Sequence, residues 1–104
     1  MTVRRVLAVV PDLMDRSRLA GTPDVEVRFA GPGVLGAVDP TSVALVVVAV
    51  SRPGALAALA EATVAVPLVG FGPHVEDERL AAAMAAGCTR VLARSKFFAR
   101  WPDV

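Results

Sequence analysis

The fold of this chain is decided by Pro67-Leu-Val-Gly-Phe-Gly-Pro-His74 and by Ala85-Ala-Gly-Cys-Thr-Arg-Val-Leu-Ala-Arg-Ser-Lys-Phe97. The first stretch is an apolar run that ends in Gly-Pro, which predicts a strand followed by a turn. The second begins as the end of a helix, stops at a glycine and continues as a short apolar strand with a charged end. Strand, helix, glycine turn and strand in this order predict a βαβ unit with parallel strands.

Further apolar blocks precede this unit, and each ends at proline, glycine or a charge cluster. Continuous Val/Leu runs without polar alternation are typical of strands that helices cover on both faces, which favours a parallel sheet. The fold class is therefore α/β, with right-handed crossovers placing helices on both sides of the sheet. The expected strands cover residues 6–10, 25–29, 43–50, 67–71 and 91–93.

The segments between these strands differ in helix content. Residues 54–63 and 76–86 are rich in alanine, and in the second of them Leu80, Ala83, Met84 and Gly87 share one expected face. Residues 12–20 allow just over two turns, whereas residues 30–40 contain three glycines and two prolines and predict a single turn or a loop. After the last strand only residues 95–104 remain, with Ser95 as a possible N-cap, so a full closing helix is not expected.

Composition limits the classes of protein to which the chain can belong. A length of 104 residues with 55% hydrophobic residues predicts one domain over 1–104. The formal charge of +1 gives no global field for nucleic acid or an anionic membrane. No apolar run is long enough to span a bilayer, no signal peptide is visible, and the single cysteine, Cys88, suits a reducing compartment. We expect a cytoplasmic protein that binds neither nucleic acid nor membrane.

The order and spacing of these elements, above all Pro67 to His74 and Ala86-Gly87, resemble the receiver domains of bacterial response regulators. The resemblance covers most of the chain and is weaker in identity before Pro67. It implies a three-layer flavodoxin-like fold with a five-stranded parallel sheet of strand order 2-1-3-4-5, here with shortened second and last helices.

Receivers use a set of conserved groups at the strand ends for phosphoryl transfer. An acidic pair holds Mg²⁺, an Asp accepts the phosphoryl group, and a hydroxyl and a Lys bind the transferred oxygens. The resemblance places these roles, in chain order, at Val10-Pro11 with Asp12 one position beyond, Ala49, Gly72 and Arg94, the receiver's aromatic residue at Val91 and its cis-proline at Ser95. It therefore implies a pseudo-receiver that is not phosphorylated on aspartate and holds neither metal nor cofactor.

Other polar residues are expected at the same edge of the sheet, where ligands of open parallel sheets bind. These candidates for anion or small-ligand binding are Asp12, Arg52, His74, Arg94, Ser95 and Lys96. Guanidinium groups and helix N-termini would suit an anion, a nucleotide or a phosphorylated partner. The same residues also suit an ordinary solvated rim in which an Asp12–Arg94 salt bridge replaces the metal site.

The last feature is a group of aromatic residues, Phe97, Phe98 and Trp101. They indicate either a final turn packed on the sheet or an exposed surface for a partner, including a second copy of the chain. No Ser, Cys or second His stands where it would form a catalytic set with His74, so we expect no enzyme. The leading hypothesis is a regulatory domain that works through protein contact, possible homodimerisation included, and the alternative is a small-ligand or anion-binding protein.

Overall fold

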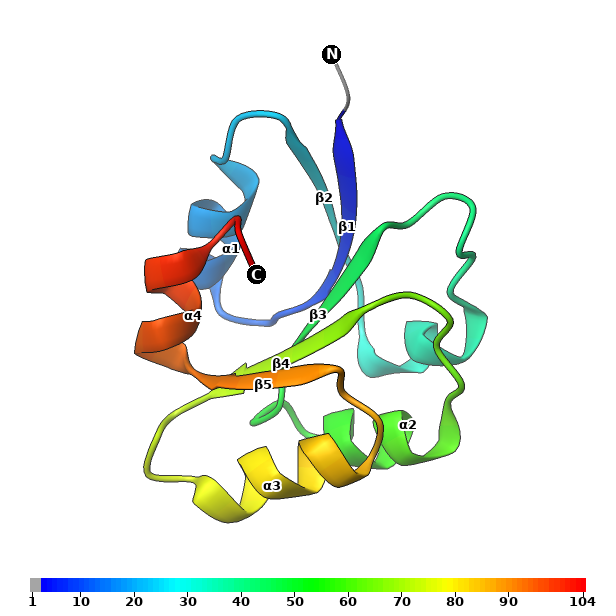
Figure 1. Cartoon of the computed structure of the whole chain (residues 1–104), viewed down its shortest axis with the longest axis vertical. Coiled ribbons are helices and arrows are strands. Elements are labelled where there is room, and N and C mark those ends of the chain that lie inside the picture. Colours follow the sequence, from blue (N-terminus) through cyan, green and yellow to red (C-terminus); the bar gives the residue numbers. More distant parts are fainter. Residues whose placement is uncertain (1–2) are drawn as a thin grey trace.

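The computed structural model describes residues 3 to 104 as five strands that alternate with helices (Figure 1). The strands are β1 (Arg4–Val9), β2 (Val25–Phe29), β3 (Leu45–Ala49), β4 (Leu68–Gly72) and β5 (Arg90–Ala93). The α-helices are α1 (Leu13–Ala20), α2 (Ala55–Glu61), α3 (Asp77–Ala85) and α4 (Arg94–Arg100), and a 3₁₀ helix, η1, covers Pro32–Ala37. The predicted α/β class is confirmed.

All neighbouring strands are parallel, and their order is β2-β1-β3-β4-β5. This confirms the predicted five-stranded sheet of order 2-1-3-4-5. The register pairs Val9 with Val48, Ala49 with Phe71 and Gly72 with Ala93, so the carboxyl ends of β1, β3, β4 and β5 meet at one edge.

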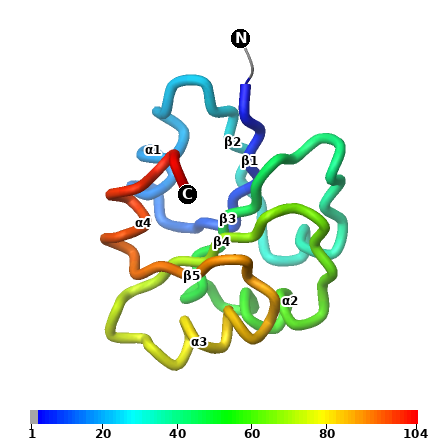
Figure 2. Tube along the Cα trace, viewed as in Figure 1, coloured from blue at the N-terminus to red at the C-terminus, as the bar shows by residue number. Residues whose placement is uncertain are grey.

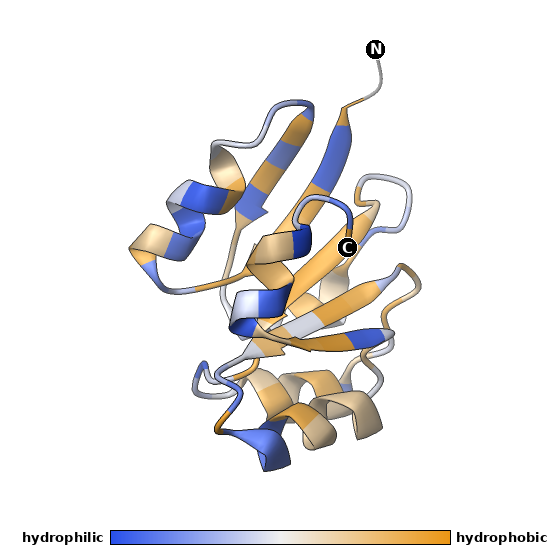
Figure 3. Cartoon of the chain, turned by 60° about the vertical axis from the view of Figure 1, so that its left-hand side comes forward, coloured by the Kyte–Doolittle hydropathy of each residue, from blue (hydrophilic) through white to orange (hydrophobic). Residues whose placement is uncertain are grey.

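Alternate side chains of the central strands build two hydrophobic cores, one on each face of the sheet. Val6, Ala8 and Val47 pack with α1 and α4, whereas Leu7 and Val46 pack with η1, α2 and α3. Figure 2 follows the chain and shows α4 beside α1, although they stand at opposite ends of the sequence. In Figure 3 β3 is hydrophobic along its length and β2 alternates, as expected for a central and an edge strand.

The crossovers have the lengths that glycine and proline allow. Residues 30–40 form only the six-residue 3₁₀ helix, with Pro32 at its first position; this is slightly more than the expected single turn or loop and, as expected, no regular α-helix. Gly87 follows α3 with a φ of +117°, the left-handed stop predicted for it. Of the residues expected to share one face of α3, Ala83 is buried, whereas Met84 is 51% exposed.

The C-terminal segment forms the seven-residue helix α4, in agreement with the shortened last helix that was expected. Ala93 has extended backbone and α4 begins at Arg94, so Ser95 lies inside the first turn and makes no cap. The prediction of Ser95 as N-cap is therefore wrong, because the helix follows β5 directly. None of the helices formed by residues 3–104 combines the length and apolar character that crossing a bilayer requires.

Candidate functional site

A cavity of about 240 Å³ lies at the carboxyl ends of the strands. Its lining comes from the loops after β1, β3 and β4 and from the start of α4, the region where open parallel sheets bind ligands. Apolar groups and backbone dominate this lining. The residues are Pro11, Asp12, Asp15, Ala49, Ser51, Arg52, Pro53, Phe71, Gly72, Pro73 and Arg94.

The acidic side chains of this cavity come from the start of α1. Asp12 is the N-cap of the helix, and its Oδ1 accepts a hydrogen bond from the backbone N–H of Asp15 at 3.0 Å. Asp15 lies one turn before Leu19 on the inward face of α1, and both residues are buried. The carboxylate of Asp12 therefore stabilises the start of α1, and that of Asp15 lies buried on the inward face of the helix.

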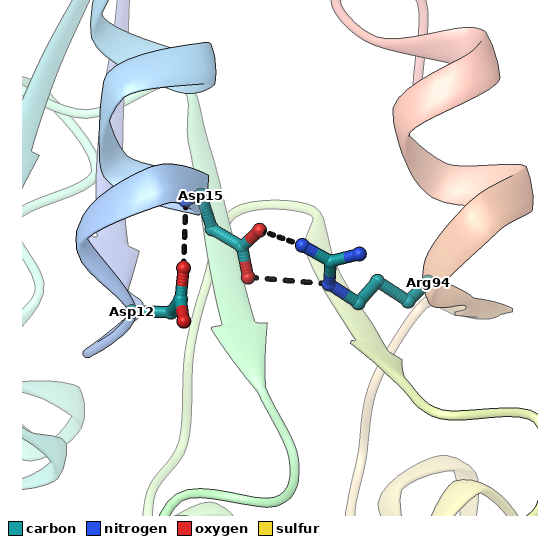
Figure 4. Close-up of polar contacts among 3 residues, drawn as sticks. All are labelled: Asp12, Asp15 and Arg94. Carbon is teal, nitrogen blue, oxygen red and sulfur yellow. Dashed lines mark hydrogen bonds and ion pairs between the residues drawn. The ribbon is translucent and has the colours of Figure 1, made fainter.

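Arg94 neutralises the buried carboxylate of Asp15 (Figure 4). Its Nη2 donates to Oδ1 of Asp15, and its Nε lies 3.4 Å from Oδ2, so the guanidinium and the carboxylate meet edge to edge. The Asp15 side chain is 7% exposed and that of Arg94 is 44% exposed. Hydrogen bonding to Asp15 raises the pKa of the Arg94 guanidinium. The expected Asp12–Arg94 salt bridge is wrong: Asp12 caps α1, and the residue one turn further reaches Arg94.

Two arginines also contact the ring of Phe98. The guanidinium carbon of Arg18 lies 4.3 Å from the ring centroid and that of Arg94 lies 5.3 Å from it. Arg94 therefore links α1, through Asp15, with an aromatic residue of its own helix. This arrangement fixes α4 against α1 at the rim of the cavity.

The side of the cavity at Gly72 has no room for a side chain. A Cβ placed on Gly72 would lie 2.8 Å from Cγ2 of Val50, closer than such atoms approach. Val50 belongs to the core on the α2/α3 face, so it cannot withdraw freely. A hydroxyl-bearing residue at position 72 is excluded unless Val50 moves.

A polar network closes the loops beside Gly72. Ser51 Oγ donates to Oε2 of Glu76 at 2.8 Å, and Oε1 of Glu76 lies 3.2 Å from Nε of Arg79. The carboxylate is shared between a hydroxyl and a guanidinium, so it is not free to act as a base toward Ser51. Among residues 3–104, no three His, Cys, Asp or Glu side chains gather as metal ligands would.

The structure brings only part of the predicted polar set together. Asp12, Arg52 and Arg94 line the cavity, and Arg52 makes no ion pair with any residue of 3–104. His74, Ser95 and Lys96 are exposed and lie outside the lining. Asp15 was missed, although its spacing of four residues from Leu19 places both on one face of α1 and was a usable signal.

The aromatic group of α4 lies mostly inside the protein. Phe97 is fully buried and stacks on Phe71 with 4.6 Å between ring centroids. Phe98 and Trp101 are half-buried, and Nε1 of Trp101 donates to Oγ1 of Thr22 at 2.6 Å. The expectation of Phe97 as an interface residue is therefore wrong, because α4 lies flat on β4 and α1 and buries this ring.

Comparison with solved structures supports the fold. The chain is similar to a response regulator from Hahella chejuensis, with 22% identity, a TM-score of 0.70 and coverage of 97% of this chain and 96% of that one. It is also similar to a CheY-like response regulator from Mesorhizobium loti, with 17% identity, a TM-score of 0.59 and coverage of 89% and 87%. The chain therefore has the fold of receiver domains. No family model and no curated protein matched the sequence.

Proposed function

We propose that this chain is a regulatory domain with the receiver fold that works through protein contact and is not phosphorylated on aspartate. The observation that carries the proposal is the chemistry of the strand-end cavity. Ala49, which has no nucleophilic atom, stands at the end of β3, and the buried carboxylate of Asp15 is already neutralised by Arg94. A phosphoryl acceptor needs a free carboxylate beside a metal ion.

The same cavity argues against an enzyme of another kind. Ser51 supplies a hydroxyl, but its hydrogen-bond partner Glu76 is also bound to Arg79. His74 is exposed in the next loop and does not line the cavity. Nucleophilic catalysis needs a base within hydrogen-bond reach of the nucleophile and free to take its proton. The cavity supports binding better than it supports chemistry.

Incubation with acetyl phosphate and Mg²⁺, followed by intact-mass measurement, tests the absence of phosphorylation. The wild type should gain no acid-labile phosphoryl group under conditions that modify a phosphorylatable response regulator. The Ala49→Asp variant should also stay unmodified, because Asp12 caps α1, Asp15 is paired with Arg94, and Val50 excludes a hydroxyl at position 72. An acid-labile phosphate on any aspartate of the wild type would overturn the proposal.

Anion binding is the second candidate, and one observation favours it. Arg52 lines the cavity without a carboxylate partner among residues 3–104. If this guanidinium binds an anion, sulfate should raise the melting temperature more than chloride at equal ionic strength. The difference should disappear in Arg52→Gln and persist in Arg28→Gln, which removes an exposed cation from the edge strand β2.

A further inference from the structure

The three most exposed large apolar side chains of residues 3–104 belong to segments that also line the strand-end cavity. Leu13 and Met14, at the start of α1, are each 76% exposed, and Val75, in the loop after β4, is 77% exposed. Leu13 and Met14 stand between the lining residues Asp12 and Asp15, and Val75 stands two residues after the lining residue Pro73. They take little part in the core, so their exposure costs free energy until something covers them.

The strand-end cavity is a hollow into which apolar side chains of this kind can insert. Ala49, Phe71 and Gly72 contribute from the ends of β3 and β4, and the loops after β1, β3 and β4 each contribute a proline, namely Pro11, Pro53 and Pro73. At about 240 Å³ the cavity is slightly smaller than most small-molecule sites, whose volumes begin at ~300 Å³. Its volume suits one or two apolar side chains. One face thus carries both projecting apolar groups and a place to insert them.

The charges of this face are also complementary to one another. Arg52 has no ion-pair partner among residues 3–104, and Asp12 uses one carboxylate oxygen to cap α1 while the other has no hydrogen bond. The face therefore carries one acidic and one basic group in excess of its internal pairs. An isologous two-fold interface needs on one surface both a group and the group that it contacts on the partner, and this face carries both signs of charge, projecting apolar groups and a cavity.

We propose that two copies of this chain associate through the strand-end face, which is defined by Leu13, Met14, the cavity, Asp12 and Arg52. Leu13 and Met14 of one protomer pack over the cavity of its partner, and Asp12 pairs with Arg52 across the two-fold axis. The proposal rests on the proposed function, since contact replaces phosphorylation as the use of this edge. It also moves the possible homodimer away from the aromatic residues of α4, of which Phe97 is fully buried and Phe98 and Trp101 are partly buried in the protein's own core.

The first test measures self-association by sedimentation equilibrium up to millimolar concentration. Wild type should show a dimer whose fraction rises with concentration. Met14→Glu should raise the dissociation constant by about tenfold or more, as loss of a central apolar contact does. Met84→Glu is the matched control, because Met84 is also an exposed methionine on a helix, away from this face. It should leave the dissociation constant unchanged.

The second test exchanges the charges. Asp12→Lys and Arg52→Glu should each weaken the dimer, since like charges then meet twice across the axis. An equimolar mixture should restore association, because the heterodimer regains an opposite pair at both positions. Asp12→Asn keeps the N-cap and separates loss of charge from loss of helix stability. Recovery in the mixture also shows that both variants are folded.

Three results would overturn the proposal: a wild type that stays monomeric, equal weakening by Met84→Glu and Met14→Glu, or a mixture that fails to recover. A monomer would leave the face to a different protein or to a small apolar molecule. The proposed function fails separately. If the protein is monomeric and accepts no phosphoryl group, only the proposed dimer is wrong. If it is dimeric and becomes phosphorylated, only the proposed absence of phosphorylation is wrong.

Discussion

Asp15 is the charged side chain that this protein takes out of water, and Arg94 compensates it. Among residues 3–104 no other charged residue is buried. Burial of an unpaired carboxylate is costly, so the folded state needs Arg94 as long as Asp15 is buried. Two apolar residues in place of both side chains could give the same stability. Arg94 stands far from Asp15 in the sequence. It lies close to Asp15 in the fold because β5 ends at the same edge of the sheet at which α1 begins.

Removal of the two partners should have unequal effects. Arg94→Gln leaves the Asp15 carboxylate buried without its counter-charge and should cost about 1–2 kcal/mol of unfolding free energy, less than for a fully buried pair because Arg94 is partly exposed. Asp15→Asn leaves Arg94 access to water and should cost less. Urea unfolding of both variants and of the double variant measures this. Additive costs would contradict a direct interaction.

Cys88 gives a prediction about pH at the same scale. Burial raises the pKa of its thiol from 9.0 to about 11. The folded state therefore holds the proton more tightly than the unfolded chain, so the stability that this group contributes is complete below about pH 9 and is lost as the pH rises toward 11.

The composition makes this effect measurable. The chain has no tyrosine and only one lysine, the exposed Lys96, so few other side chains titrate in that range. Melting temperatures of wild type should fall between pH 9 and 11 more steeply than those of Cys88→Ala. Parallel curves for the two proteins would show that the thiol titrates alike in both states.

Helix α4 is the element whose role differs most from the sequence-based expectation. It is two turns long, begins at Arg94 and places Phe97 between β4 and Trp101. Phe97→Ala should cost about 3–5 kcal/mol, as large-to-small changes of buried aromatic residues do. Lys96→Ala, on the exposed side of the same helix, should stay within about 0.5 kcal/mol. Denaturant unfolding compares them, and a small cost for Phe97→Ala would show that α4 is dispensable to the core.

The sequence predicts the elements that rest on local patterns. Continuous Val/Leu runs mark β3 and β1, and the glycines and prolines of residues 30–40 mark the short η1, because these signals act within a few residues. It does not predict contacts that close over long separations. Which carboxylate pairs with Arg94, and whether Phe97 is buried, both depend on how α1 packs against α4. Local periodicity in the sequence does not predict this packing.

The candidate site follows the same division. The resemblance to receivers correctly places Ala49, Gly72 and Arg94 at the strand ends, because strand order and loop length are features of the whole fold. The resemblance does not predict that Leu13 and Met14 are exposed. Apolar residues on a helix are normally expected to face the core. The structure shows that Asp15 and Leu19 occupy the inward face of α1, and their spacing of four residues was the only local signal of it.

At the scale of the whole molecule, two cores share one sheet. The core with α1 and α4 and the core with η1, α2 and α3 use alternate residues of β1, β3 and β4. Each layer of helices packs on the same strands. Loss of one layer would expose one face of these strands to water and so destabilise the sheet on which the other layer packs. We therefore expect the two layers to unfold together, as a single cooperative unit.

The chain carries one natural probe in each layer. Trp101, its single tryptophan, packs in the α1/α4 core, and Cys88, its single cysteine, is buried in the other. Tryptophan fluorescence and the accessibility of the thiol to pulse labelling, followed across one guanidinium titration, should give the same midpoint. If the thiol became accessible at a lower denaturant concentration than that at which the fluorescence changed, the α2/α3 layer would open while α4 stayed packed. The strands would then hold one core without the other, and the single cooperative unit would be wrong.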